Sequence, residues 1–217
     1  MTRGPRAREP VAPRTREQQK HETRERVFTT AMRLFDARGY EQTSVDDGVR
    51  ATGLARGTVY FHVPTKDDVL LEAVRRGEAL ILLRVGALGE SARLRRVLEA
   101  TIDAFLEAWE ARRALLPYAG AVSLRRIAGV REASEGDPLR LELGRRVTLA
   151  AGRGELSSPL PGPMLADVFL LQVFAALMTW STTGAPSVEV LRAGLVELFF
   201  HGVGGATRTR TRATREG

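Results

Sequence analysis

The chain has 217 residues, of which 43% are hydrophobic, and it contains no cysteine. This length and composition suit one large or two smaller globular domains, and they exclude disulfides and thiolate zinc sites. The formal net charge of +7 belongs to the two ends of the chain, because residues 1–26 carry eight basic and four acidic side chains and residues 206–217 carry four and one.

The N-terminus is rich in Arg and Pro and has no apolar core, so we do not expect a secretory signal. No uninterrupted apolar run reaches about 18 residues, the length that indicates a membrane span. We therefore expect a soluble, cytoplasmic protein with no membrane partner.

Residues 1–20 mix Arg, Pro and Gln with few large apolar groups, and we expect a disordered basic tail there. A helical pattern begins near Thr23 and places Val27, Ala31 and Leu34 on one stripe. Gly39 is expected to end this helix.

The stretch TSVDDGVRATGLARGTVYFHVPTK, residues 43–66, predicts two short helices joined by a tight turn. We place the helices at residues 44–52 and 55–63, with Gly53 between them, where a positive φ costs a glycine least. The second helix presents small and hydrogen-bonding groups in place of a second apolar face. Such a helix suits the major groove of DNA, which admits one α-helix.

Residues 26–71 resemble the DNA-binding region of the TetR family of transcriptional regulators. The matching residues are Ala31, Leu34, Phe35, Gly39, Tyr40, Thr43, Ser44, Val45, Gly53, Leu54, Gly57, Thr58, Val59, Tyr60, His62, Lys66, Leu70 and Leu71. Gly48, Val49, Ala55 and Val63 depart from the family pattern and predict a looser local core. The rest of the chain is similar only in being helical and of suitable length.

The resemblance implies an all-α fold, with an N-terminal helix-turn-helix DNA-binding domain and a larger C-terminal helical domain for ligand binding and dimerisation. It also implies that Arg56, Gly57 and Thr58 approach the bases of a double-stranded operator. The residues implied at the phosphates are Thr43, Ser44, Tyr60, His62 and Lys66. We expect the DNA-binding domain at residues 21–66, the regulatory domain at 67–204 and a disordered tail at 205–217.

Several further helices follow the break at Pro64. Thr65 is expected to cap the first of them, and residues 86–90 form a loop. Ser91 is expected to cap a helix that runs to about Leu116, where Pro117 ends or kinks it. Shorter helices are expected at residues 118–133 and 138–151, followed by a loop at 153–163.

The last two expected helices, residues 164–182 and 187–203, are unusually apolar. The first is apolar nearly all round, and such a helix must be covered on both sides. We therefore expect a homodimer through residues 164–203, with a four-helix bundle across a two-fold axis. The alternative is that these helices are buried core.

The family resemblance also suggests a small-molecule inducer in the second domain. The side chains most able to line a pocket are Phe105, Trp109, Tyr118, Phe174, Met178 and Trp180. Because few polar groups interrupt these stripes, such a ligand would be mainly apolar, although ordinary core packing explains the same pattern.

No sequence motif predicts a catalytic residue, a metal site or a cofactor. We expect a DNA-binding transcriptional regulator, a repressor that a small ligand releases from a pseudo-palindromic operator, and not an enzyme. Two alternatives stay open, a ligand-independent regulator and a helical small-molecule-binding protein.

Overall fold

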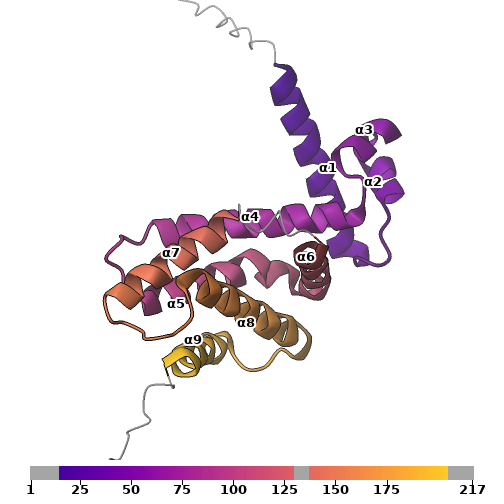
Figure 1. Cartoon of the computed structure of the whole chain (residues 1–217). Coiled ribbons are helices and arrows are strands. Elements are labelled where there is room, and N and C mark those ends of the chain that lie inside the picture. The colour runs from indigo at the N-terminus through magenta and orange to yellow at the C-terminus, as the bar shows by residue number, and fades with distance from the viewer. Residues whose placement is uncertain (1–14, 130–136, 205–217) are drawn as a thin grey trace, which may run out of the picture. The chain divides into compact units, whose positions relative to one another are not determined.

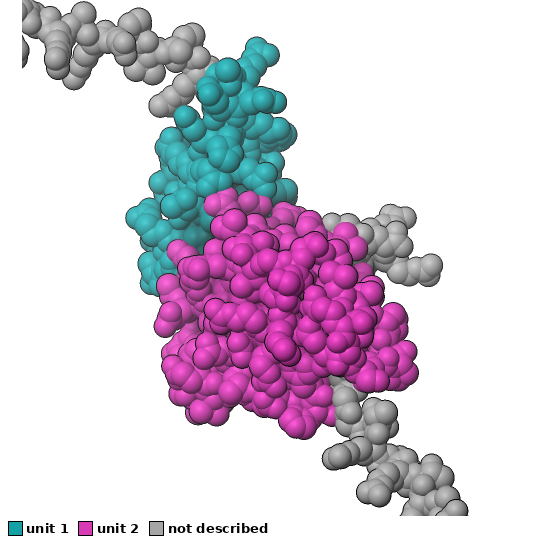
Figure 2. Space-filling model, turned by 90° about the vertical axis from the view of Figure 1, so that its left-hand side faces the viewer, with its two compact units in different colours: residues 1–69 teal, residues 70–217 magenta. Residues whose placement is uncertain are grey.

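The computed structural model describes residues 15–129 and 137–204, and every regular element within them is a helix. The all-α prediction is thus confirmed for these residues. The chain divides into two compact units, Met1–Val69 and Leu70–Gly217 (Figure 2). The division falls inside helix α4, Lys66–Gly86, whereas the sequence placed the domain boundary at residue 66.

Helix α1, Arg16–Arg38, begins earlier than the sequence pattern indicated. The expected start near Thr23, with a disordered tail as far as residue 20, is wrong. A capping box begins the helix, because the Thr15 hydroxyl accepts the Gln18 amide at 3.2 Å and the Thr15 amide donates to the Gln18 side chain at 2.9 Å. These bonds satisfy amides that a helix start otherwise leaves without partners. Residues 1–14 lie outside the described residues.

Helices α2, Val45–Thr52, and α3, Arg56–His62, lie beside α1 in the same unit (Figure 1). Gly53 ends α2 with a φ of 65°, in the left-handed region that glycine enters without a Cβ clash. This turn lets α3 fold back so that Val59, which is 1% exposed, joins the buried core of the unit.

A small cavity remains in that core beside Gly48. Residues of α1, α2, α3 and the start of α4 line it together with Val63, which follows α3, and the lining includes Val27, Phe35 and Val45. A Cβ added at Gly48 would meet no neighbouring atom within 4 Å. The structure therefore has a packing gap at Gly48 and Val63, two of the positions where the sequence predicted a looser core.

Both ends of α4 have side-chain partners. Thr65 caps its start as predicted, because the Thr65 amide donates to the Asp68 carboxylate at 2.9 Å and the Asp68 amide donates to the Thr65 hydroxyl at 3.3 Å. At the other end, the buried guanidinium of Arg146 donates to carbonyl oxygens of the last turn of α4 and of the loop that follows it. These acceptors are Val85 at 3.2 Å, Leu88 at 3.0 Å and Gly89 at 2.8 Å.

Ser91 does not cap the next helix, which is α5, Leu94–Trp109. The residue at its start, Arg93, makes no side-chain bond to the helix. Glu155 takes this role, because its carboxylate accepts the Leu94 amide hydrogen at 2.6 Å. A carboxylate also suits the positive end of the helix dipole.

The predicted end of this helix at Leu116 is wrong as well. The α-helical turns stop at Trp109, and a 3-10 segment, Glu110–Leu115, follows with a kink at Arg112. Helix α6, Leu116–Gly129, then begins with Pro117 in its first turn, where the missing proline amide costs no hydrogen bond. Residues 130–136, which the expected helix 118–133 enters, lie outside the described residues.

The remaining helices of the second unit are α7, Pro138–Gly152, α8, Gly162–Thr183, and α9, Val188–Gly204. Helix α8 packs against α7 and α6, while α9 packs against α5 and α8. The rings of Phe169 and Phe199 meet edge to face at 5.5 Å between α8 and α9. Helices at these places were predicted, and residues 205–217 lie outside the described residues.

Helix α8 is long and apolar enough to cross a membrane by length and composition alone, although its longest uninterrupted apolar run is short. A core helix of a soluble protein meets the same criterion, so this is weak evidence for a membrane span. Part of its surface is buried against α6, α7 and α9, and Met164, Val168 and Leu171 are exposed.

The cavity predicts that Gly48→Ala stabilises the first unit. Alanine is favoured over glycine in a helix interior by roughly 0.5–1 kcal/mol, and the added methyl group enters open space. We expect amide hydrogen exchange in α2 to slow by up to about fivefold in the full chain. Gly53→Ala is the matched control and should speed exchange, because φ is 65° there. Faster exchange in Gly48→Ala would contradict the cavity.

Candidate nucleic-acid interface

Helix α3 carries five of the eight residues predicted to meet DNA. Val59 and Val63 are buried one turn apart, and this leaves Gly57 and Phe61 on the opposite face of the helix. Arg56 is exposed beside them, while Thr58, Tyr60 and His62 are half-buried.

Arg56 belongs to a cluster with Asp46 of α2 and Tyr60 of α3. Its Nη2 lies 3.2 Å from Asp46 Oδ2, and the Tyr60 hydroxyl donates to Asp46 Oδ1 at 3.1 Å. Arg56 Nη2 also donates to the Tyr60 hydroxyl at 3.5 Å, and the guanidinium carbon lies 5.2 Å from the Tyr60 ring centroid. The pKa of Arg56 is raised above its ordinary value, first by the hydrogen bond to Tyr60 and then by the charge of Asp46.

Gly57 has open space where a side chain would stand, since an added Cβ would meet no neighbouring atom within 4 Å. Packing within the described residues therefore does not require a glycine here. Close approach of a binding partner to the backbone is a physical reason for one. Phe61, at 69% exposed, is the large apolar group of the same face.

At the start of α2, Ser44 is engaged in a reciprocal cap with Asp47. The Ser44 hydroxyl accepts the Asp47 amide at 3.2 Å and donates to the Asp47 carboxylate at 2.5 Å. Arg50 donates to the same carboxylate at 2.6 Å. The pKa of Asp47 is held well below its ordinary range, first by the Ser44 hydroxyl, then by the Ser44 amide and Arg50.

The polar atoms of Thr43 and Lys66 are engaged within the first unit. Thr43 is buried, and its hydroxyl donates to the Gly39 carbonyl at 2.8 Å. Lys66 Nζ donates to the carbonyls of Tyr40 and Glu41 at 3.2 and 3.4 Å, and it lies 4.4 Å from the Tyr40 ring centroid. Both side chains thus hold the segment between α1 and α2 in place.

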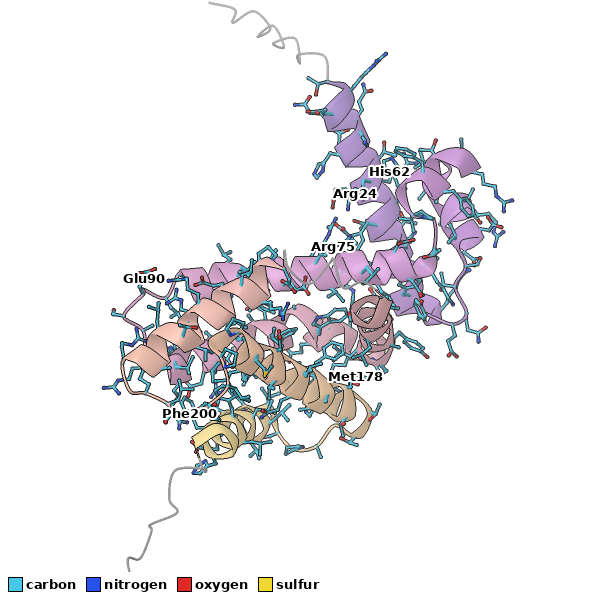
Figure 3. All side chains as sticks on the ribbon, in the orientation of Figure 1. Arg24, His62, Arg75, Glu90, Met178 and Phe200 are labelled. Atoms are coloured by element: carbon cyan, nitrogen blue, oxygen red, sulfur yellow. The ribbon has the colours of Figure 1, made fainter. Side chains whose placement is uncertain are left out.

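His62, the last residue of α3, lies near cationic side chains of α1, among them Arg24 (Figure 3). Its pKa is lowered, first by burial and then by the charges of Lys20 and Arg24. Lys20 Nζ also lies 5.5 Å from the ring centroid of Phe61. The early turns of α1 therefore add positive charge beside α3.

Sequence reasoning missed four residues of this region: Lys20, Arg24, Asp46 and Phe61. Lys20 and Arg24 were assigned to the disordered tail or to its boundary with the first helix, because the start of α1 was placed too late. The signal for Phe61 was present in the sequence, because Val59 and Val63 are apolar and one turn apart, and residue 61 falls opposite them on a helix.

The six predicted pocket residues lie on α5, α6 and α8 of the second unit. Phe174 and Met178 of α8 pack on α6 at Gly120, where an added Cβ would lie 2.7 and 2.6 Å from them. Trp109 is buried, with its indole nitrogen near Gly77 of α4. Trp180 donates to the Pro186 carbonyl at 3.1 Å. Phe105 is buried in α5 and Tyr118 is half-buried in α6.

Within residues 15–129 and 137–204, no group of three or more His, Cys, Asp or Glu side chains is placed to hold a metal ion. The positively charged and hydrogen-bonding surface of α3 is the feature of these residues that indicates a ligand class, and that class is nucleic acid.

Residues 27–73 match the model of the bacterial regulatory proteins of the tetR family. This stretch is therefore a DNA-binding region of the tetR type. The regulator AcrR of Shigella flexneri is 34% identical over 68 residues, which cover 31% of this chain and 32% of that protein. The repressor BepR of Brucella suis biovar 1 is 28% identical over 174 residues, which cover 73% of this chain and 80% of that protein. The match to AcrR thus spans only about a third of that relative's length.

Solved structures of transcriptional regulators have the same fold over most of the chain. The repressor FadR of Thermus thermophilus, solved in complex with lauroyl-CoA, has a TM-score of 0.66 at 22% identity and covers 89% of this chain and 100% of that one. A regulator of Saccharomonospora viridis, solved in complex with choline, has a TM-score of 0.57 at 21% identity. The match covers 84% of this chain and 98% of that regulator. At this identity the likeness shows the TetR fold alone.

The environment of His62 generates a prediction about its titration. The imidazole should titrate below the ordinary value of 6.5, and Lys20→Gln should raise its pKa by removing a cationic neighbour. Because the unfolded state takes up the proton first, the first unit should lose stability as the pH falls through 6.5. NMR titration of the three histidines measures this directly. A His62 pKa above 6.5, or no response to Lys20→Gln, would contradict the placement of α1 beside α3.

Proposed function

We propose that this chain is a dimeric transcriptional repressor that acts in the cytoplasm and reads a pseudo-palindromic operator with α3. The observation that carries the proposal is the composition of the outward face of α3. A guanidinium, a glycine with open space, a threonine and an exposed aromatic ring lie together on one short helix. A single α-helix of this kind fits the major groove.

In this proposal Arg56 and Thr58 read base edges, and Gly57 lets the backbone of α3 approach the DNA. Phe61 makes an apolar contact, for which the thymine methyl group is the matching partner in the major groove. Ser44 and His62 contact phosphates. Tyr60 supports Arg56, because its hydroxyl is bonded to Asp46 beside that side chain.

The dimer is proposed to form through the exposed surfaces of α8 and α9. Met164, Val168 and Leu171 follow helical spacing on α8 and remain between 44% and 51% exposed, and Val190 and Leu198 of α9 are each 60% exposed. Five exposed apolar side chains on two adjacent helices are costly in a monomer. A second copy related by a two-fold axis would cover them as a four-helix bundle.

We further propose that an apolar small molecule bound in the second unit releases the operator. The support is the apolar packing of α5, α6 and α8, together with the acyl-CoA present in the Thermus thermophilus repressor structure. Such a ligand must prefer the state that cannot bind DNA, because equal affinity for both states shifts no equilibrium.

Selection from a random-sequence duplex pool tests this function. The purified full chain should enrich a sequence with two-fold related half-sites whose centres lie about 10 base pairs, or a multiple of this, apart. Arg56→Gln should lose discrimination by about 1–3 kcal/mol at one base pair of each half-site, while binding to unrelated duplex changes much less. Enrichment of no sequence would contradict the proposed function.

A charged substitution on the proposed dimer surface tests whether dimerisation is needed to bind the second half-site. Leu171→Glu places a charge on an exposed position of α8, so the fold of the chain should survive. Loss of the second half-site from the footprint, with unchanged helical content, is the expected result. An unaltered two-half-site footprint would contradict dimerisation through α8.

A further inference from the structure

Asp46 lies at the centre of the side chains on which the proposed base recognition depends. Its two carboxylate oxygens have different partners, since Oδ2 pairs with Arg56 and Oδ1 accepts from Tyr60. Its neighbour Asp47 is engaged elsewhere, with Ser44 and Arg50. The two adjacent carboxylates of α2 therefore serve different partners.

The geometry leaves Arg56 able to bind a base while Asp46 holds it. Both of its bonds in this cluster use Nη2, and the donors on Nε and Nη1 are left for a base edge. Because these two donors point to different sides of the guanidinium, each can give one hydrogen bond to a base-edge acceptor, such as O6 or N7 of guanine in the major groove. The Tyr60 ring under the guanidinium further restricts its rotamers.

We propose that Asp46 is a specificity-determining residue, which positions Arg56 for a base and makes the same surface unfavourable to an unspecific phosphate. This inference rests on the proposed function. A free arginine loses considerable rotamer entropy when it is fixed, and the pair with Asp46 removes part of that loss before DNA arrives. The carboxylate also repels a phosphate placed beside it, so Arg56 gains less from duplex that offers it no base partner.

The two effects predict opposite changes in two affinities. Asp46→Asn should weaken binding to the duplex that the wild-type chain selects, by up to about fivefold, the upper range for an exposed ion pair. The same variant should bind a scrambled duplex of equal length more tightly. The ratio of the two affinities, measured at one salt concentration, is the readout, because salt alone changes both.

Other roles of Asp46 would move the two affinities together. If the carboxylate only repels DNA, Asp46→Asn raises both affinities, and if it only stabilises the fold, both fall; either result overturns the inference. Asp47→Asn is the matched control, since it removes an equal charge one residue away and should shift both affinities in one direction.

A double-mutant cycle shows whether Asp46 acts through Arg56. In an Arg56→Gln background, Asp46→Asn should leave the affinity ratio unchanged. An equal loss of the ratio in both backgrounds would overturn the positioning role. Tyr60→Phe, which removes one bond to Asp46, should lower the ratio less than Asp46→Asn.

If the wild-type chain selects no sequence at all, the proposed function fails and this inference fails with it. Selection of a sequence with an unchanged affinity ratio in Asp46→Asn overturns the inference alone.

Discussion

The left-handed turn at Gly53 is the constraint on which the DNA-facing surface depends. With a φ of 65°, Gly53 begins the reversal of the chain, which takes the three residues between α2 and α3. That reversal directs Val59 into the core formed with α1 and thereby turns Gly57 and Phe61 outward. It also brings Asp46 of α2 within hydrogen-bonding distance of Arg56 and Tyr60 of α3. Core packing and the recognition surface thus have the same geometric origin.

In the second unit, charged side chains of α7 and the loop after it satisfy the ends of two other helices. Arg146 supplies donors for the last carbonyls of α4 and its following loop, and Glu155 accepts the first amide of α5. Buried helix ends need such partners, because each unsatisfied polar group costs about 1–3 kcal/mol. A ligand that displaced α7 would therefore disturb the end of α4 within the same unit.

Local spacing was sufficient to predict the helix-turn-helix and the glycine turn, because the burial pattern of α2 and α3 is set by residues a few positions apart. The looser core around Gly48 was predicted from departures from the family pattern, not from spacing. The start of α5 could not be predicted in this way, since its cap, Glu155, lies 61 residues from Leu94. The start of α1 was readable in Thr15 and Gln18, but the surrounding Arg and Pro residues favoured a disordered assignment.

The roles of individual DNA-facing side chains were less predictable than their positions on α3. Thr43 and Lys66 fall at the family spacing, yet their polar atoms bond to carbonyl oxygens within the unit. Asp46 was missed because an acidic residue in the first turn of a helix has a sufficient local explanation in the helix dipole. Its contacts with residues 10 and 14 positions later appear only after the turn has formed.

The most direct test of the central claim is a map of where α3 lies on bound DNA. Because the chain contains no cysteine, an Ala55→Cys variant offers a single thiol at the exposed start of α3, to which an iron chelate can be attached. Cleavage of the selected duplex should centre on two positions, one in each half-site and about 10 base pairs, or a multiple of this, apart. Uniform cleavage, or none while the protein remains bound, would contradict the claim that α3 reads the operator.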